Sequence, residues 1–276
     1  MADGPRVVIT ADDFGAALAV NEAVEIAHRD GLLTAASLMV AGAAAGDAVA
    51  RARRLPALGV GLHIVLADGA PVLPAEQVSA LVGTDGRLPA DMVRTAFAIA
   101  CNPVARRQME AEVEAQFAAF AATGLALDHV NAHKHFHMHP LIARAIVRAG
   151  RAYRLDAVRV PRERAAGVLF ERWAALIGGY FRRQGLMVTD RVAGLAASGA
   201  FDAARMRAAL AGLGDGLTEI YCHPATSDEW PGSARGYRYR DELAALLDQP
   251  ALALREGSAA RFGSFASLHS TTRTTV

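Results

Sequence analysis

Short runs of β-branched and other apolar residues alternate along the chain with longer, alanine-rich segments of helical periodicity. The apolar runs predict strands at residues 7–11, 35–40, 59–64, 126–131, 157–160, 187–192 and 218–222, with residues 260–265 as an eighth. The segments between them predict helices at residues 18–29, 43–54, 103–123, 141–153, 164–183, 201–213 and 240–247. Seven or eight such units favour an α/β fold, a regular or distorted (β/α) barrel, as a single domain over residues 1–276.

Residues 67–91 interrupt this alternation. Several glycines and prolines break the segment, which is too long for an ordinary turn between a strand and a helix. Since the loops after barrel strands surround the active face, we expect this segment to form an excursion over that face.

Composition narrows the class of protein. The 29 basic and 28 acidic residues nearly cancel, so the chain lacks the overall positive charge that would hold a nucleic acid. Cys101 and Cys222 form neither a disulfide framework nor a thiolate metal site, which indicates a reducing compartment. The first residues do not resemble a signal peptide, and apolar stretches fall short of the ~18 residues of a membrane span. We therefore expect a soluble, cytoplasmic protein without a transmembrane segment, which can still meet a partner at a membrane surface.

Polar residues stand where the predicted strands end. In a (β/α) barrel these ends converge on one mouth, where active sites lie. The residues are Asp12, Asp13, His63, His133, Arg159 and His223. Carboxylates, imidazoles and a guanidinium at one mouth indicate a metal-dependent hydrolytic site.

Each of these groups also has a simpler interpretation. One of Asp12 and Asp13 could cap the following helix or loop instead of binding a cation or acting as a base. Arg159 could hold a site carboxylate in its ionised form, contact substrate, or bind surface acids. Beyond His223, the rings of Trp230, Tyr237 and Tyr239 could stack on sugar rings or anchor a long loop.

Five of the nine histidines lie on odd-numbered positions between His129 and His139. In an extended chain they would share one face, with Lys134 on the opposite face. The four from His133 onward would then span roughly 20 Å, whereas each metal bond is only ~2.1 Å long. At most two can bind one ion, and the others must contact substrate, support the ligands through hydrogen bonds, or cover the helix after Pro140. His137 is a candidate for the substrate role.

Four ordered segments, TADDFG, GLHIVLADGAPV, NAHKHFHMHP and EIYCHPA, resemble the YdjC/ChbG-type carbohydrate deacetylases. The second and third are most similar to the branch associated with hopanoid biosynthesis. The resemblance implies a distorted (β/α) barrel, like that of polysaccharide deacetylases and glycoside hydrolases. It also implies an acetylated amino-sugar substrate, including one linked to a lipid such as an N-acetylglucosaminyl hopanoid.

The same resemblance assigns roles to individual residues. It implies Asp13, His63 and His133 as ligands of one divalent metal ion, Asp12 as the catalytic base and His223 as the acid. Asn131 departs from relatives that carry aspartate two places before the ligand histidine. An Asp-His-His set accepts zinc, cobalt, magnesium or manganese, so the sequence leaves the ion open.

Two other functions fit part of the pattern. An amidohydrolase or phosphoesterase could use the same barrel, although amidohydrolases usually carry an HxH motif on strand one, where this chain has two aspartates. A non-catalytic module that binds metal or sugar is the other alternative, because fold alone does not determine function.

Overall fold

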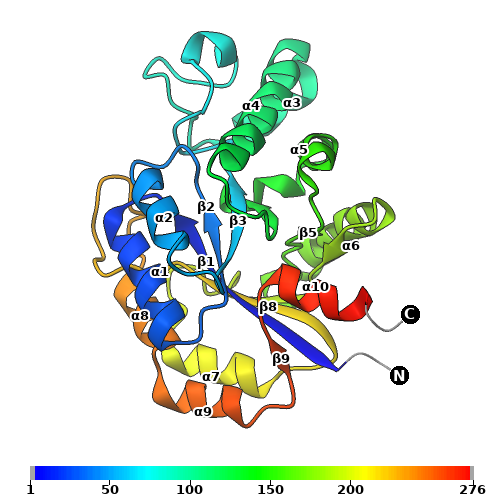
Figure 1. Ribbon diagram of the computed structural model, residues 1–276. Coiled ribbons are helices and arrows are strands. Elements are labelled where there is room, and N and C mark those ends of the chain that lie inside the picture. Colours follow the sequence, from blue (N-terminus) through cyan, green and yellow to red (C-terminus); the bar gives the residue numbers. More distant parts are fainter. Residues whose placement is uncertain (1–3, 274–276) are drawn as a thin grey trace.

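Parallel strands form the inner layer of the fold and helices surround them in the computed structural model, which describes residues 4–273 (Figure 1). The strands are β1 (Pro5–Phe14), β2 (Ala35–Leu38), β3 (Gly59–Ile64), β4 (Val130–Ala132), β5 (Ala157–Val158), β6 (Met187–Val188), β7 (Arg191–Ala193), β8 (Gly216–Cys222) and β9 (Arg261–Phe262). Their order is β6-β5-β4-β3-β2-β1-β8-β7, with β9 paired to β1. This curled sheet confirms the predicted α/β, barrel-like fold.

Most of the helices cover the outside of the strands (Figure 1), whereas α10 packs against the amino ends of the strands. The helices are α1 (Leu18–Asp30), α2 (Ala45–Ala52), α3 (Met92–Cys101), α4 (Pro103–Ala122), α5 (Pro140–Gly150), α6 (Val168–Arg183), α7 (Ala203–Ala211), α8 (Tyr239–Leu246), α9 (Gln249–Glu256) and α10 (Phe265–Arg273). The predicted helices are present, whereas α3, α9 and α10 were not predicted. In α3 the pattern misleads because Val93 and Phe97 are exposed while Thr95 is buried. Within the described residues, none of the helices combines the length and apolar character that crossing a bilayer requires.

The sheet departs from a regular barrel between residues 187 and 193. The prediction of a single strand over residues 187–192 was wrong, because β6 pairs with β5 whereas β7 pairs with β8 at the other end of the strand order. The Thr189 hydroxyl bonds the backbone N–H and C=O of Val160, both at 2.8 Å. The next amide, of Asp190, donates to Leu217 O at 2.8 Å. Residues 189 and 190 therefore connect the two ends of the strand order, β6 and β7.

The interrupted segment at residues 67–91 contains the 3₁₀ helix η1 (Ala75–Val78) and packs beside α4 (Figure 1). The Glu112 carboxylate on α4 accepts bonds from the amides of Val72 and Leu73, at 2.8 and 3.0 Å. Asp68 is the one member of this segment that lines the catalytic cavity described below. The expectation that the segment covers the active face was therefore wrong, because buried Glu112 holds it against α4.

Inward-facing side chains change from apolar to charged along the strands. At the amino ends, Val8, Ala35, Ala157 and Leu217 form an apolar cluster with Phe265 and Leu268 of α10. The next inward positions are polar and buried, at Thr10, Ser37, Arg159 and Glu219. Since side chains alternate along a strand, Val8, Thr10 and Asp12 of β1 share the inner side. The charged groups consequently gather at the carboxyl ends.

Candidate metal and catalytic site

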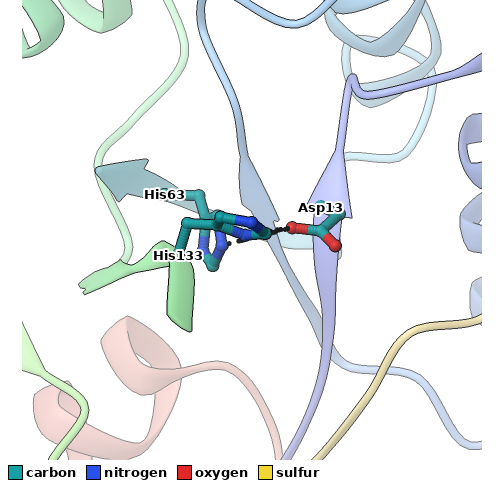
Figure 2. Close-up of side chains that lie close together, drawn as sticks. All are labelled: Asp13, His63 and His133. Carbon is teal, nitrogen blue, oxygen red and sulfur yellow. Dashed lines mark hydrogen bonds and ion pairs between the residues drawn. The ribbon is translucent and has the colours of Figure 1, made fainter. Parts of the chain in front are cut away.

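Asp13, His63 and His133 come together at the carboxyl ends of β1, β3 and β4 (Figure 2). Their ligand atoms all lie within 4.8 Å of one another. Asp13 Oδ1 is 3.3 Å from His63 Nε2 and 3.1 Å from His133 Nδ1. The structure thus assembles the three residues that were predicted to bind a metal.

The donor atoms fit a divalent cation. Ligands held ~2.1 Å from a tetrahedral ion stand about 3.4 Å apart, close to the separations observed here. His63 Nε2 is buried and has no hydrogen-bond partner within the described part of the chain. Burial raises the pKa of the Asp13 carboxyl, but the charge and hydrogen bond of His133 outweigh it and hold that pKa well below its usual range. An ionised carboxylate beside an unpartnered imidazole nitrogen is what a cation would satisfy.

A local distortion of β1 allows both adjacent aspartates to reach the cavity. Asp13 has φ +60, in the left-handed region that aspartate tolerates better than most residues. The pairing of β1 with β2 shifts register between Ala11 and Phe14. Neither aspartate caps the next helix, because α1 begins after Ala17 without a side-chain cap bond. Asp12 and Asp13 both line the cavity instead.

Asp12 pairs with the buried guanidinium of Arg159. Arg159 is fully buried, and its two terminal nitrogens donate to the two carboxylate oxygens of Asp12. Arg159 also donates to both oxygens of Glu219, at 3.0 and 2.8 Å. Although burial raises the pKa of Asp12, the Arg159 charge and hydrogen bonds lower it far more, so the carboxyl stays ionised. Arg159 does not line the cavity and holds a site carboxylate, and its predicted contact with substrate stays a prediction.

His223, at the end of β8, carries a positive charge near neutral pH. Its Nδ1 lies 3.7 Å from Oε2 of Glu242, a fully buried residue on α8. Burial lowers the pKa of His223, but Glu242 and the carboxylates of Asp13 and Asp12 raise it to about 9. His223 lines the cavity and can therefore present a proton there.

The histidine run after β4 is not extended, contrary to expectation. Residues His133–Met138 form a short 3₁₀ segment in which Lys134 and His135 have φ of 53 and 56. The left-handed residues break the alternation of faces, so Lys134 lines the cavity and pairs with Asp68 instead of pointing away from the site. His135 also lines the cavity, where its Nε2 lies 2.9 Å from the Tyr221 hydroxyl.

The other histidines of the run support the structure. His137 Nε2 donates to the backbone oxygen of Arg159 at 3.0 Å, and burial and the Arg159 charge lower its pKa to about 3. His137 is fully buried and does not line the cavity, and its predicted contact with substrate stays a prediction. His139 caps α5 by accepting a bond from Leu141 N. His129 is buried beside Asp128.

The cavity beside these groups has a volume of about 380 Å³, within the range of small-molecule sites. Trp230, Tyr237 and Tyr239 form an aromatic part of its wall. The Trp230 and Tyr239 rings lie 4.3 Å apart, and the Tyr237 ring lies 5.4 Å from that of His223. The stacking role predicted for Trp230 and Tyr237 is compatible with these positions and remains a prediction.

Three residues that shape the site were not predicted: Glu219, Tyr221 and Glu242. Glu219 and Tyr221 share with His223 the alternate positions of one strand, and this period-two pattern could have revealed them. Because only the last polar residue of each strand was considered, Glu219 and Tyr221, which precede His223 in the sequence, were overlooked. Glu242 lies on an amphipathic helix, where a single carboxylate gives no sign of burial.

Comparisons with known proteins identify relatives of this chain. A human protein named carbohydrate deacetylase is 34% identical over 244 residues, covering 79% of this chain and 74% of the human one. A Geobacillus stearothermophilus protein of the same name is 30% identical over 250 residues, covering 89% and 90%. One from Brevibacillus brevis is 36% identical over 156 residues, and the match spans only 56% of this chain and 59% of that protein.

The fold and the family have independent support. A crystal structure from Enterococcus faecalis V583, of a protein for which cellobiose-phosphate cleavage is suggested, superposes with a TM-score of 0.79. It is 22% identical and the match covers 96% of this chain and 99% of that one, which supports the fold alone. The sequence model described as YdjC-like protein matches residues 6–256. This chain therefore belongs to the YdjC-like family.

Proposed function

We propose that this protein is a metal-dependent hydrolase that removes the acetyl group from an N-acetylated sugar. The observation that carries the proposal is the Asp13, His63 and His133 cluster, which lines one cavity together with ionised Asp12 and protonated His223. The relatives named carbohydrate deacetylase support the choice of an acetylated sugar.

The side chains divide the reaction between them. A divalent cation, when bound, would polarise the acetyl carbonyl and lower the pKa of water. Asp12 would accept a proton from the attacking water through Oδ2. Among the described residues Oδ2 accepts a hydrogen bond from Arg159 alone, whereas Oδ1 accepts from both Arg159 and Asn131. His223 would donate its proton to the sugar nitrogen as the carbon–nitrogen bond breaks. Acetate and a free amino sugar are the products.

The substrate that we infer is a sugar linked to a lipid, including an N-acetylglucosaminyl hopanoid. An open groove of about 620 Å³ shares Lys134, His135 and Leu195 with the catalytic cavity. Its other residues are largely apolar, and include Met92, Phe136, Met138, Phe170 and Trp173. Nearby on α3 and α6, Val93 and Leu169 are 82% and 83% exposed. An apolar groove beside a sugar-sized cavity supports a substrate with a lipid part, met at the cytoplasmic surface of a membrane.

Acetate release tests the proposal. We expect hydrolysis of an N-acetylglucosaminyl hopanoid that a chelator abolishes and a divalent cation restores, with weaker release from free N,N′-diacetylchitobiose. Trp173→Gln should raise KM for the lipid-linked substrate and leave chitobiose hydrolysis unchanged. Leu254→Gln is the matched control, since Leu254 on α9 is 40% exposed and Trp173 is 42% exposed. Equal acetate release in chelator would contradict the role of the metal, and none from any acetylated sugar would favour a binding module.

The pH profile tests His223. We expect kcat/KM to fall as pH rises through the pKa of this histidine, about 9, because only the imidazolium can donate a proton. Glu242→Gln removes a negative charge that raises this pKa, so the basic limb should move to lower pH while the acidic limb stays in place. Glu110→Gln, on the exposed side of α4, is the control. An unchanged basic limb in Glu242→Gln would contradict the assignment.

A further inference from the structure

A buried chain of hydrogen bonds runs from the base of the barrel to the candidate metal ligand His63. His129 Nδ1 lies 2.9 Å from Asp128 Oδ2, and its Nε2 lies 3.0 Å from Ser37 Oγ. Asn131 Nδ2 donates to Ser37 Oγ at 2.9 Å, and Asn131 Oδ1 lies 2.7 Å from His63 Nδ1. These five side chains are at most 5% exposed, so water does not compete for their bonds.

The far end of this chain is an ionised carboxylate. Asp128 Oδ1 accepts from Ala266 N at 2.9 Å, and Oδ2 accepts from Phe265 N at 3.3 Å, where α10 begins. Burial raises the pKa of Asp128, but the hydrogen bonds from His129 and from the amide of Ala266 outweigh it and lower that pKa. An ionised carboxylate only accepts hydrogen bonds, so His129 must carry its proton on Nδ1.

The direction of every later bond follows from that proton. With its proton on Nδ1, His129 accepts at Nε2 the one proton of the Ser37 hydroxyl. Ser37 Oγ must then accept from its other neighbour, so the Asn131 amide nitrogen faces it. The amide oxygen consequently faces His63 and accepts a proton from its Nδ1. His63 Nε2 is left with a bare lone pair directed toward Asp13.

Asp12 reinforces the same orientation from the other side. Asn131 Nδ2 also donates to Asp12 Oδ1 at 3.1 Å, so the amide nitrogen faces two acceptors and the oxygen faces His63. The position of the His129 ring is built into the sheet as well, because a side chain at Gly61 would overlap that ring. The arrangement therefore depends on residues of β2, β3 and β4 together.

We propose that Asp128, His129, Ser37 and Asn131 are positioning residues that keep the His63 proton on Nδ1 and present Nε2 to the metal. Asn131 is the central member, since its amide also orients Asp12. The inference rests on the metal site of the proposed function, and partners that orient metal-binding histidines typically change metal affinity by about 10- to 100-fold.

The experiment combines nitrogen NMR of ¹⁵N-histidine-labelled, Zn²⁺-loaded protein with titration of Co²⁺ into the metal-free protein. In the wild type we expect His63 and His129 each to carry a proton on Nδ1 alone. Asn131→Leu should produce a mixture of His63 tautomers and weaken Co²⁺ binding by about 10- to 100-fold. Ser37→Ala removes one oxygen atom and should weaken Co²⁺ binding about 10-fold. This smaller change keeps the test available if Asn131→Leu does not fold.

Thr189→Ala is the matched control. Thr189 is fully buried like Ser37, but its hydroxyl bonds the backbone of Val160, so this variant should lose stability without changing the His63 ring or Co²⁺ affinity. A wild-type His63 with its proton on Nε2, or a His129 protonated on both nitrogens, would overturn the proposal. Unchanged Co²⁺ affinity in a folded Asn131→Leu or Ser37→Ala protein would do so as well. No sugar is used, so the result is independent of whether the protein proves to be a deacetylase.

Discussion

His63→Ala is expected to lose the bound cation and acetate release together. His63 Nε2 is buried, has no hydrogen-bond partner among residues 4–273 and lies 3.3 Å from Asp13 Oδ1, so its removal takes one of three donors from the site. The two remaining donors, on Asp13 and His133, would keep a cation only weakly. Loss of a residue that only hydrogen-bonds to a ligand typically weakens metal binding by about 10- to 100-fold. Loss of the ligand His63 itself should weaken binding by more than that. Metal analysis of the purified variant, together with acetate release, measures both effects.

The control for this variant is His28→Ala. His28 is a partly buried histidine at the end of α1 whose Nδ1 bonds the backbone oxygen of Leu33, and it does not line the catalytic cavity. It should retain metal and activity, which separates the loss of a ligand from the loss of any histidine. A His63→Ala protein with a full equivalent of metal would exclude His63 as a ligand.

The sequence allowed the strand ends to be predicted because barrel geometry converts order along the chain into proximity. Asp13, His63 and His133 are separated by up to 120 residues, yet each follows a run of apolar residues that forms a parallel strand. Once the runs are assigned to one barrel, their last polar groups must meet at one end. That inference needs only the period of the pattern and the direction of the strands.

The backbone at the site could not be predicted in the same way. Asp13, Lys134 and His135 adopt left-handed conformations, which residues other than glycine take infrequently, so an alternating pattern indicated an extended chain instead. The wrong conformation placed Lys134 away from the cavity and aligned all the odd-numbered histidines on one face. Tertiary contacts, such as His135 with Tyr221 and Lys134 with Asp68, accompany the observed path.

The buried charges were predicted only in part, because a site carboxylate was one of the partners expected for Arg159 but Glu219 was not identified. Asp12 and Glu219, on two different strands, both pair with the guanidinium of Arg159. Their spacing along the chain does not reveal that partnership. Each could equally have been a solvated surface group, since such residues are mostly exposed. Only their common position inside the barrel shows that they act as one unit.

Asp12→Asn is expected to keep the cation and lose turnover. Asn has nearly the same shape, and Asp12 is not among the three residues whose donor atoms converge, so metal content should remain that of the wild type. The variant cannot accept the proton of the attacking water, a role typically worth ~10² to 10⁴ in rate. Arg159 holds the pKa of Asp12 far below its usual range and makes it a weak base, so we expect a loss near the lower figure, about 10²-fold.

The structure also supplies the controls for this prediction. Arg159 remains paired with Glu219 in the variant, so its charge keeps a partner and the fold should survive. Asp190→Asn, at a 42% exposed carboxylate that pairs with Arg182, tests for the general cost of removing an ion pair and should retain full activity. Metal content, thermal unfolding and kcat are measured on all three proteins. Wild-type kcat in Asp12→Asn would exclude this carboxylate as the base, whereas lost metal would place Asp12 in the ligand set and require a different proton acceptor.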